Sequence, residues 1–356
     1  MNEFAEKVRN YLGTTYKDEI LLKEIQSFNP EIQRIPDGIY KHRGFHWEKH
    51  VLPVELSKKV YNQLPDAFKS CYDEEVRSFI RLPQGHVKFD TKYLNFLPDF
   101  RSHLITHVEV EDKSIKLHRG FHHLNSSQAM CFNYFFPLAR EGKLEEILKQ
   151  FGLGNEKVAN GTWKFEKESN IDTKERIVEE IPELKQNRDI TPTSFDFYFE
   201  TESGEKFFFE IKYTESNFSG KNKAKTTDEY PQKYRLKYER IYKEAAAGII
   251  REHDNKDTFL QNYQIMRNLI HLSKDNPRDN YVVFVIPEEN AKVLEQAKQA
   301  ETFVVDKYKE NVKVLPWNVL IKIDFGYDLK EHYKEFRRKY FPEFALNLDH
   351  PLITLT

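Results

Sequence analysis

Two carboxylates and a lysine that could support metal-dependent hydrolysis lie in two neighbouring apolar segments. Glu210 and Lys212 belong to the run KFFFEIKYT at 206–214, and Asp196 belongs to TSFDFYFE at 193–200. Side chains alternate between the two faces of a strand, so Glu210 and Lys212 share one face and the intervening apolar side chains share the other. An acid and an amine are therefore predicted to project together from the second strand.

The polar, glycine-containing stretch 201–205 between these segments predicts a β-hairpin. If the hairpin is symmetric about Ser203, Asp196 pairs with Glu210, and directly opposed residues project to the same side. A loop with one residue more or fewer would place a phenylalanine opposite Glu210 instead. The prediction of a carboxylate pair thus depends on the register.

Two adjacent carboxylates repel each other unless one is protonated or a cation lies between them. Mg²⁺ relieves this repulsion, because it prefers oxygen ligands and takes one or two protein carboxylates together with phosphate oxygens. Lys212 could then orient a water molecule or offset the charge that develops on a phosphate. The alternative from the residues alone is a solvated strand face with an incidental ion pair between Glu210 and Lys212.

The surrounding pattern predicts a mixed α/β core. Its expected order is helix, three strands, helix, strand, with a further helix and strand after it; the expected segments are a helix from Ser127 to Pro137, strands at 162–166, 194–200 and 206–214, a helix over 258–272, a strand at 282–286, a helix over 288–308 and a strand around 312–323. The continuous apolar run at 282–286 favours a strand covered on both faces. This αβββαβ order would place the hairpin inside a sheet flanked by helices.

The hairpin TSFDFYFETESGEKFFFEIKYTE resembles the active-site hairpin of the PD-(D/E)XK nuclease superfamily, and the predicted order matches its core. The segments HHLNSSQAMCFNYFFPL and FLQNYQIMRNLIHL more specifically resemble a prokaryotic group of restriction-endonuclease-like proteins. The resemblance covers about 117–286. It implies a restriction-endonuclease-like mixed sheet flanked by helices, with residues 1–115 as an N-terminal extension and 116–356 as the nuclease-like domain.

The resemblance also implies roles for individual residues. Asp196 and Glu210 would bind Mg²⁺, which Mn²⁺ could replace, and the backbone carbonyl of Ile211 would join them. Lys212 would be the catalytic lysine, and Gln264 would lie near the site; Gln261 and Asn268 share its predicted helix face. The implied activity is hydrolysis of DNA phosphodiester bonds, in prokaryotic defence or DNA processing. The chain departs from the superfamily pattern in two places, with Phe195 where a proline is common and Gln128 where some relatives carry a glutamate.

Overall charge gives no reason to expect nucleic-acid binding, because 55 basic and 57 acidic residues leave a formal net charge of −2. Between 221 and 243, however, eight Lys or Arg stand against three acids with four tyrosines interleaved. The nucleic-acid contacts predicted here are Lys221, Lys223, Lys225, Lys233, Arg235 and Lys237. A solvated helix face with ion pairs at i,i+4 is the alternative interpretation.

Two other functions remain open from the sequence. The same core could bind nucleic acid without cutting it. Histidines grouped at 42, 46 and 50 and at 103, 107, 118, 122 and 123 could instead hold zinc in a hydrolase, although HRGFH lacks the glutamate of HExxH. Two cysteines, no long apolar run and a charged N-terminus predict a cytoplasmic protein without membrane contact. A homodimer would supply two sites for a duplex.

Overall fold

The computed structural model describes most of the chain from residue 93 onward and isolated parts before it. The described residues are 3–13, 15, 16, 23, 93, 95–118, 120, 121, 123–184, 191–218 and 230–342, with the backbone of four short strands between 40 and 79. The chain divides into two compact units, Glu141–Ile323 and a second made of Met1–Arg140 with Asp324–Thr356. The boundary expected at 115/116 stays a prediction.

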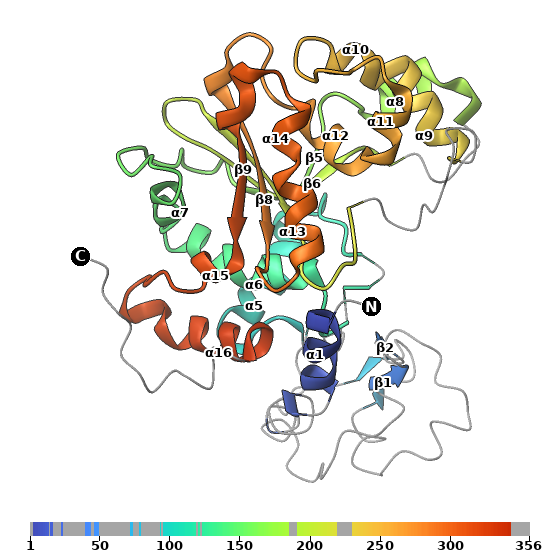
Figure 1. The fold of residues 1–356 in the computed structure, drawn as a ribbon. Coiled ribbons are helices and arrows are strands. Elements are labelled where there is room, and N and C mark those ends of the chain that lie inside the picture. Colours follow the sequence, from blue (N-terminus) through green and yellow to red (C-terminus); the bar gives the residue numbers. More distant parts are fainter. Residues whose placement is uncertain are drawn as a thin grey trace. The chain divides into compact units, whose positions relative to one another are not determined.

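A five-stranded sheet forms the centre of the unit Glu141–Ile323 (Figure 1). The strands follow chain order across the sheet and are β5 (Lys164–Glu168), β6 (Ser194–Glu200), β7 (Lys206–Ile211), β8 (Asn280–Ile286) and β9 (Val312–Pro316). The pairs β5–β6 and β6–β7 are antiparallel, whereas β7–β8 and β8–β9 are parallel. This open mixed sheet with flanking helices confirms the predicted α/β class and is consistent with a restriction-endonuclease-like fold.

The hairpin β6–β7 has the register that the sequence predicts. Phe197 pairs with Phe209 and Glu200 pairs with Lys206, which is the symmetry about Ser203. The turn closes through the backbone N–H of Thr201, which donates to the carbonyl of Glu205 at 2.8 Å. Gly204 adopts a φ of 93°, which a residue with a Cβ rarely takes. One step further from the turn, the same register places Asp196 opposite Glu210.

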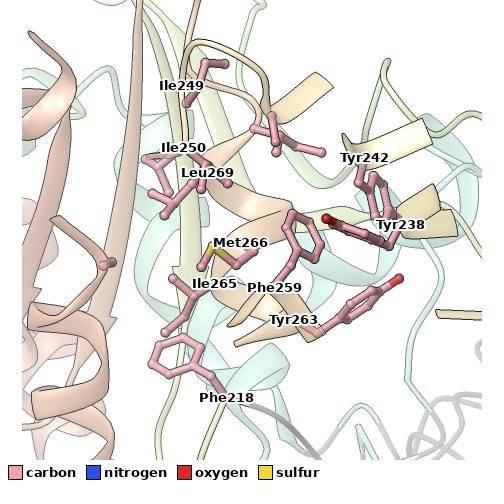
Figure 2. Packing of buried hydrophobic residues seen from close by; sticks show 14 of the residues in the cluster. Phe218, Tyr238, Tyr242, Ile249, Ile250, Phe259, Tyr263, Ile265, Met266 and Leu269 are labelled. Atoms are coloured by element: carbon pink, nitrogen blue, oxygen red, sulfur yellow. The ribbon is translucent and has the colours of Figure 1, made fainter. Parts of the chain in front are cut away.

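Helices cover the face of the sheet to which Glu210 belongs. Phe284 lies beside Glu210 in the parallel ladder and belongs to the main buried cluster, together with Met266 and Tyr242. Figure 2 shows the rings of this cluster grouped around the helix that carries Met266. The helical elements of this unit are α7 (Glu145–Lys149), α8 (Lys174–Glu180), η4 (Pro182–Leu184), α9 (Gln232–Lys237), η6 (Tyr238–Tyr242), α10 (Lys243–Ala246), α11 (Lys256–Gln261), α12 (Tyr263–Leu269), η7 (Pro277–Asp279), α13 (Ala291–Lys298), α14 (Ala300–Phe303), η8 (Asp306–Asn311) and α15 (Trp317–Leu320).

The helix expected over 258–272 is two helices that meet at Asn262. Asn262 leaves the helical region with φ −111° and ψ 29°, and its side-chain amide donates to the carbonyl of Thr258. Asparagine competes for backbone hydrogen bonds in this way and favours helix ends. Gln261 lies exposed at the end of α11.

In the second unit, a histidine compensates for a proline inside helix α6. Its elements are α1 (Glu3–Tyr11), β1 (Tyr40–Arg43), β2 (His46–Lys49), β3 (Tyr72–Asp73), β4 (Ser78–Phe79), α5 (Pro98–Thr106), η3 (His107–Glu111), α6 (Ser127–Arg140), η9 (Tyr327–Leu329) and α16 (Lys330–Tyr340). Helix α6 continues through Pro137 instead of ending there. Pro137 donates no hydrogen bond to the carbonyl of Asn133, and His332 donates to that carbonyl at 2.7 Å instead. The α16 side chain thus compensates for the proline.

Candidate active site

Three of the residues predicted to carry the chemistry converge at the open end of the hairpin β6–β7. The Lys212 ammonium lies 2.7 Å from Oε1 of Glu210, and both residues are at most 9 % exposed. Asp196 is half-buried, and its carboxylate accepts the backbone N–H of Ile211 at 2.6 Å. The two acids and the lysine therefore lie together near the start of β6 and the end of β7.

The Asp196 carboxylate lies where the ladder between the two strands ends. The paired positions stop at Phe197 and Phe209. One step further, a side chain of β6 rather than a backbone carbonyl accepts the Ile211 N–H. Ile211 therefore contributes to this contact through its N–H group, and a role of its carbonyl in metal binding stays a prediction.

Helix α12 supplies two side-chain amides to Glu210. Gln264 donates to Oε1 at 2.6 Å, and Asn268, which is fully buried, donates to Oε2 at 2.9 Å. The two residues lie four apart and so share one face of the helix. With Lys212, three donors hold the Glu210 carboxylate in place. Gln264 therefore lies beside Glu210, and its catalytic role stays a prediction.

The surroundings separate the pKa values of the two acids. Burial raises the pKa of Asp196 well above its usual range, and the neighbouring carboxylates of Glu210 and Glu166 raise it further. Burial alone would also raise the pKa of Glu210, but the cations of Lys212 and Arg267 outweigh it and hold that pKa below its usual value. Glu210 is thus the charged member of the pair, and Asp196 holds a proton more readily.

Lys212 remains protonated at neutral pH. Burial alone would lower its pKa, but the carboxylates of Glu210, Glu215 and Asp196 outweigh this effect and raise it above the ordinary value. The ammonium also lies 5.5 Å from the centre of the Phe218 ring. Lys212 is therefore a positioned cation, and it is poorly suited to accept a proton.

The donor set fits a hard divalent cation. Two neighbouring carboxylates supply oxygen ligands, and a cation would offset the repulsion that raises the pKa of Asp196. Among the described residues, no three side chains of His, Cys, Asp or Glu are arranged to hold a metal. A site with two carboxylates suits Mg²⁺, which keeps several waters and takes few protein ligands.

A third carboxylate near the site, Glu166, was not predicted from the sequence. The β5–β6 register pairs Phe165 with Phe197 and Lys167 with Phe195, so Glu166 lies opposite Asp196. Its φ of 49° is the only positive value among the described residues other than glycine. An isolated acid in the segment 162–166 gives no signal for this position, because only the pairing of β5 with β6 brings the two acids together.

The predicted nucleic-acid contacts have different surroundings. Lys221, Lys223 and Lys225 lie outside the described residues. Lys233 and Arg235 are half-exposed on α9. Lys237 is buried, and its ammonium lies 3.1 Å from the carboxylate of Asp172 and donates to the carbonyl of Thr191. The charge of Lys237 is thus paired with the carboxylate of Asp172 inside the protein.

Asp172 is the centre of a second buried polar cluster beside α12. It accepts hydrogen bonds from Lys237, from the hydroxyl of Tyr242 at 2.6 Å and from the backbone and hydroxyl of Thr193. Burial alone would raise the pKa of Asp172, but these donors outweigh it and hold the pKa below its usual value. A carboxylate so fully bonded has a structural role in this arrangement.

The remaining expectations concern Gln128 and the histidines. The side chain of Gln128 bonds the backbones of Lys116 and His118. Four of the grouped histidines have side chains that the structure does not describe: His42, His46, His50 and His122. A zinc site there stays untested. Among the described histidines of these groups, His107 is paired with Glu111.

A family model matches residues 73–341, about three quarters of the chain. It is described as REase-ARP, Restriction Endonuclease associating with ARP. The chain belongs to the REase-ARP family. The REase-ARP match includes all five strands of the central sheet and every residue of the candidate site. No curated protein matches the chain, and no solved structure does.

None of the described helices has the length and apolar character that a membrane crossing requires. Membership in a restriction-endonuclease family suggests a nuclease, and it is consistent with the hairpin site.

Proposed function

We propose that this protein is a metal-dependent endonuclease of the PD-(D/E)XK type that hydrolyses DNA phosphodiester bonds. The observation that carries the proposal is the convergence of Asp196, Glu210 and Lys212 on one hairpin, with the Lys212 ammonium 2.7 Å from Glu210. Membership in a restriction-endonuclease family supports the same activity and suggests DNA as the substrate.

Asp196 and Glu210 would hold Mg²⁺, with the carbonyl of Ile211 as a further oxygen ligand. When bound, the ion would polarise a phosphoryl oxygen and lower the pKa of an attacking water. Glu210 is held ionised by Lys212, Gln264 and Asn268, so it presents a fixed charge.

Lys212 would act as an electrostatic group. Its ammonium stays protonated beside the carboxylates, so it can donate a hydrogen bond to the phosphate as negative charge builds up in the transition state. Gln264 and Asn268 do not need to touch the substrate for this role, because they fix the carboxylate that anchors Lys212.

The test is cleavage of supercoiled plasmid DNA with Mg²⁺, with Mn²⁺ and with EDTA. We expect nicked or linear products with either metal and none with EDTA. Asp196→Asn should abolish cleavage while circular dichroism shows a folded protein, because the amide still accepts the Ile211 N–H but loses the negative charge. The matched control is Glu200→Gln, an acid on the same strand and face, which should cut like the parent. Equal cleavage by Asp196→Asn and the parent would refute the proposal.

A further inference from the structure

Arg267 is a cation next to the candidate site that the proposed hydrolysis does not use. It lies on α12 between Gln264 and Asn268, the two residues that donate to Glu210. Its guanidinium is one of the two main positive groups that lower the pKa of Glu210. The residue is half-buried, so part of it is exposed to solvent. Arg267 is therefore close to Glu210 and partly exposed.

The Arg267 guanidinium is not paired with a carboxylate of any described residue. It lies 5.8 Å from the centre of the Tyr263 ring, and within the described part of the chain it has neither an ion pair nor a hydrogen bond. Its Nε is buried and unbonded. A buried N–H without an acceptor destabilises the protein. An acceptor brought by a ligand would relieve this.

The surroundings of Arg267 indicate what kind of ligand would bind. Tyr263, beneath the guanidinium, packs against Tyr234 of α9 with ring centres 4.5 Å apart. Lys233 on the same helix and Arg267 both bring positive charge toward Lys237. Lys237 pairs with its own buried carboxylate, Asp172, whereas no described carboxylate forms an ion pair with Arg267. The positive charge thus continues from the hairpin toward α9, as a phosphate backbone would require.

We propose that Arg267 binds a phosphate of the DNA backbone adjoining the bond that is cut. The proposal rests on the proposed nuclease function and assigns a substrate contact to a residue outside the carboxylate–lysine set. A guanidinium suits this role because its planar N–H groups match two phosphate oxygens at once. Stacking on Tyr263 would hold the plane in place before the DNA arrives.

The test measures binding apart from cleavage. A fluorescein-labelled DNA duplex of mixed sequence is titrated with the Asp196→Asn chain, and fluorescence anisotropy gives Kd over a series of salt concentrations. Adding Arg267→Gln should raise Kd about tenfold and reduce the slope of log Kd against log salt by about 0.9, the value of one phosphate contact. Arg251→Gln is the matched control, because Arg251 already pairs with Asp306; it should change neither quantity.

Arg267→Lys keeps the inference testable if Arg267→Gln fails to fold. Lysine retains the charge near Glu210 but lacks the planar pair of donors, so Kd should rise at least about threefold with the slope unchanged. Unchanged Kd in Arg267→Lys, or unchanged Kd and slope in a folded Arg267→Gln, would reject the role of Arg267. If the parent cuts DNA in that case, the proposed function still stands. A parent that neither binds nor cuts DNA overturns both proposals.

Discussion

Replacing Lys237 by methionine tests whether this lysine stabilises the fold or contacts nucleic acid. The Lys237 ammonium lies 3.1 Å from Asp172, which is fully buried, and the lysine side chain is 8 % exposed. Methionine keeps the apolar stem and removes the charge, so Asp172 would keep its hydrogen bonds from Tyr242 and Thr193 and lose its only ion pair among the described residues.

Removing one partner of a buried ion pair costs about 3–5 kcal/mol. The remaining donors to Asp172 place the expected cost near the lower limit, about 3 kcal/mol. For a unit that spans Glu141–Ile323, each kcal/mol shifts the melting temperature by about 2–4 °C. We therefore expect Lys237→Met to melt about 6–12 °C below the parent.

Thermal unfolding followed by circular dichroism measures this shift, and urea denaturation gives the free energy of unfolding. Lys233→Met is the matched control, because it lies one turn away on the same helix and is half-exposed; its change should stay within about 0.5 kcal/mol. Adding Asp172→Asn to Lys237→Met should recover much of the loss, because no buried charge then lacks its partner. A Lys237→Met protein as stable as the parent but weaker in DNA binding would refute the structural role.

Three further predictions concern protons and charges near the site. Asp196→Asn should raise the melting temperature of the metal-free protein at neutral pH, because burial and the Glu210 and Glu166 carboxylates make the Asp196 charge unfavourable; calorimetric titration with Mn²⁺ should show that binding is lost. Burial lowers the pKa of His271 to about 4 in the folded protein. As the pH falls from about 6.5 to 4, this histidine is therefore protonated in the unfolded chain before it is protonated in the folded one. Urea midpoints should then report a loss of up to about 3 kcal/mol over that range, which His271→Gln should reduce. Gln264→Leu removes a hydrogen bond to the charged form of Glu210, so the acid limb of the cleavage pH profile should move to higher pH; an unmoved limb would contradict this.

The sequence predicted the hairpin because its information is local. Alternating apolar residues and a short glycine-containing turn define both strands and their register, and the register brings Asp196 to Glu210. Gln264 could be placed near the site because helical periodicity and the family resemblance pointed to the same residue. The hairpin prediction required no contact between distant parts of the chain, whereas the placement of Gln264 depended on the resemblance.

The sequence could not predict contacts set by tertiary packing. Lys237 looks like its exposed neighbours in a basic segment, and only its proximity to Asp172, 65 residues earlier, shows that it is buried. Glu166 comes near Asp196 only through the pairing of β5 with β6. The helix is interrupted at Asn262, and the apolar periodicity of 258–272 does not reveal this break.

The candidate site depends on a crossover connection. Helix α12 lies in the segment between β7 and β8, which pair in parallel, and it supplies Gln264 and Asn268 to a carboxylate on β7. Parallel pairing closes a long loop, so it forms late compared with a hairpin. During synthesis the hairpin emerges from the ribosome well before α12 and β8. A nascent chain thus carries Asp196 and Glu210 before the two amides that hold Glu210 in place have been made.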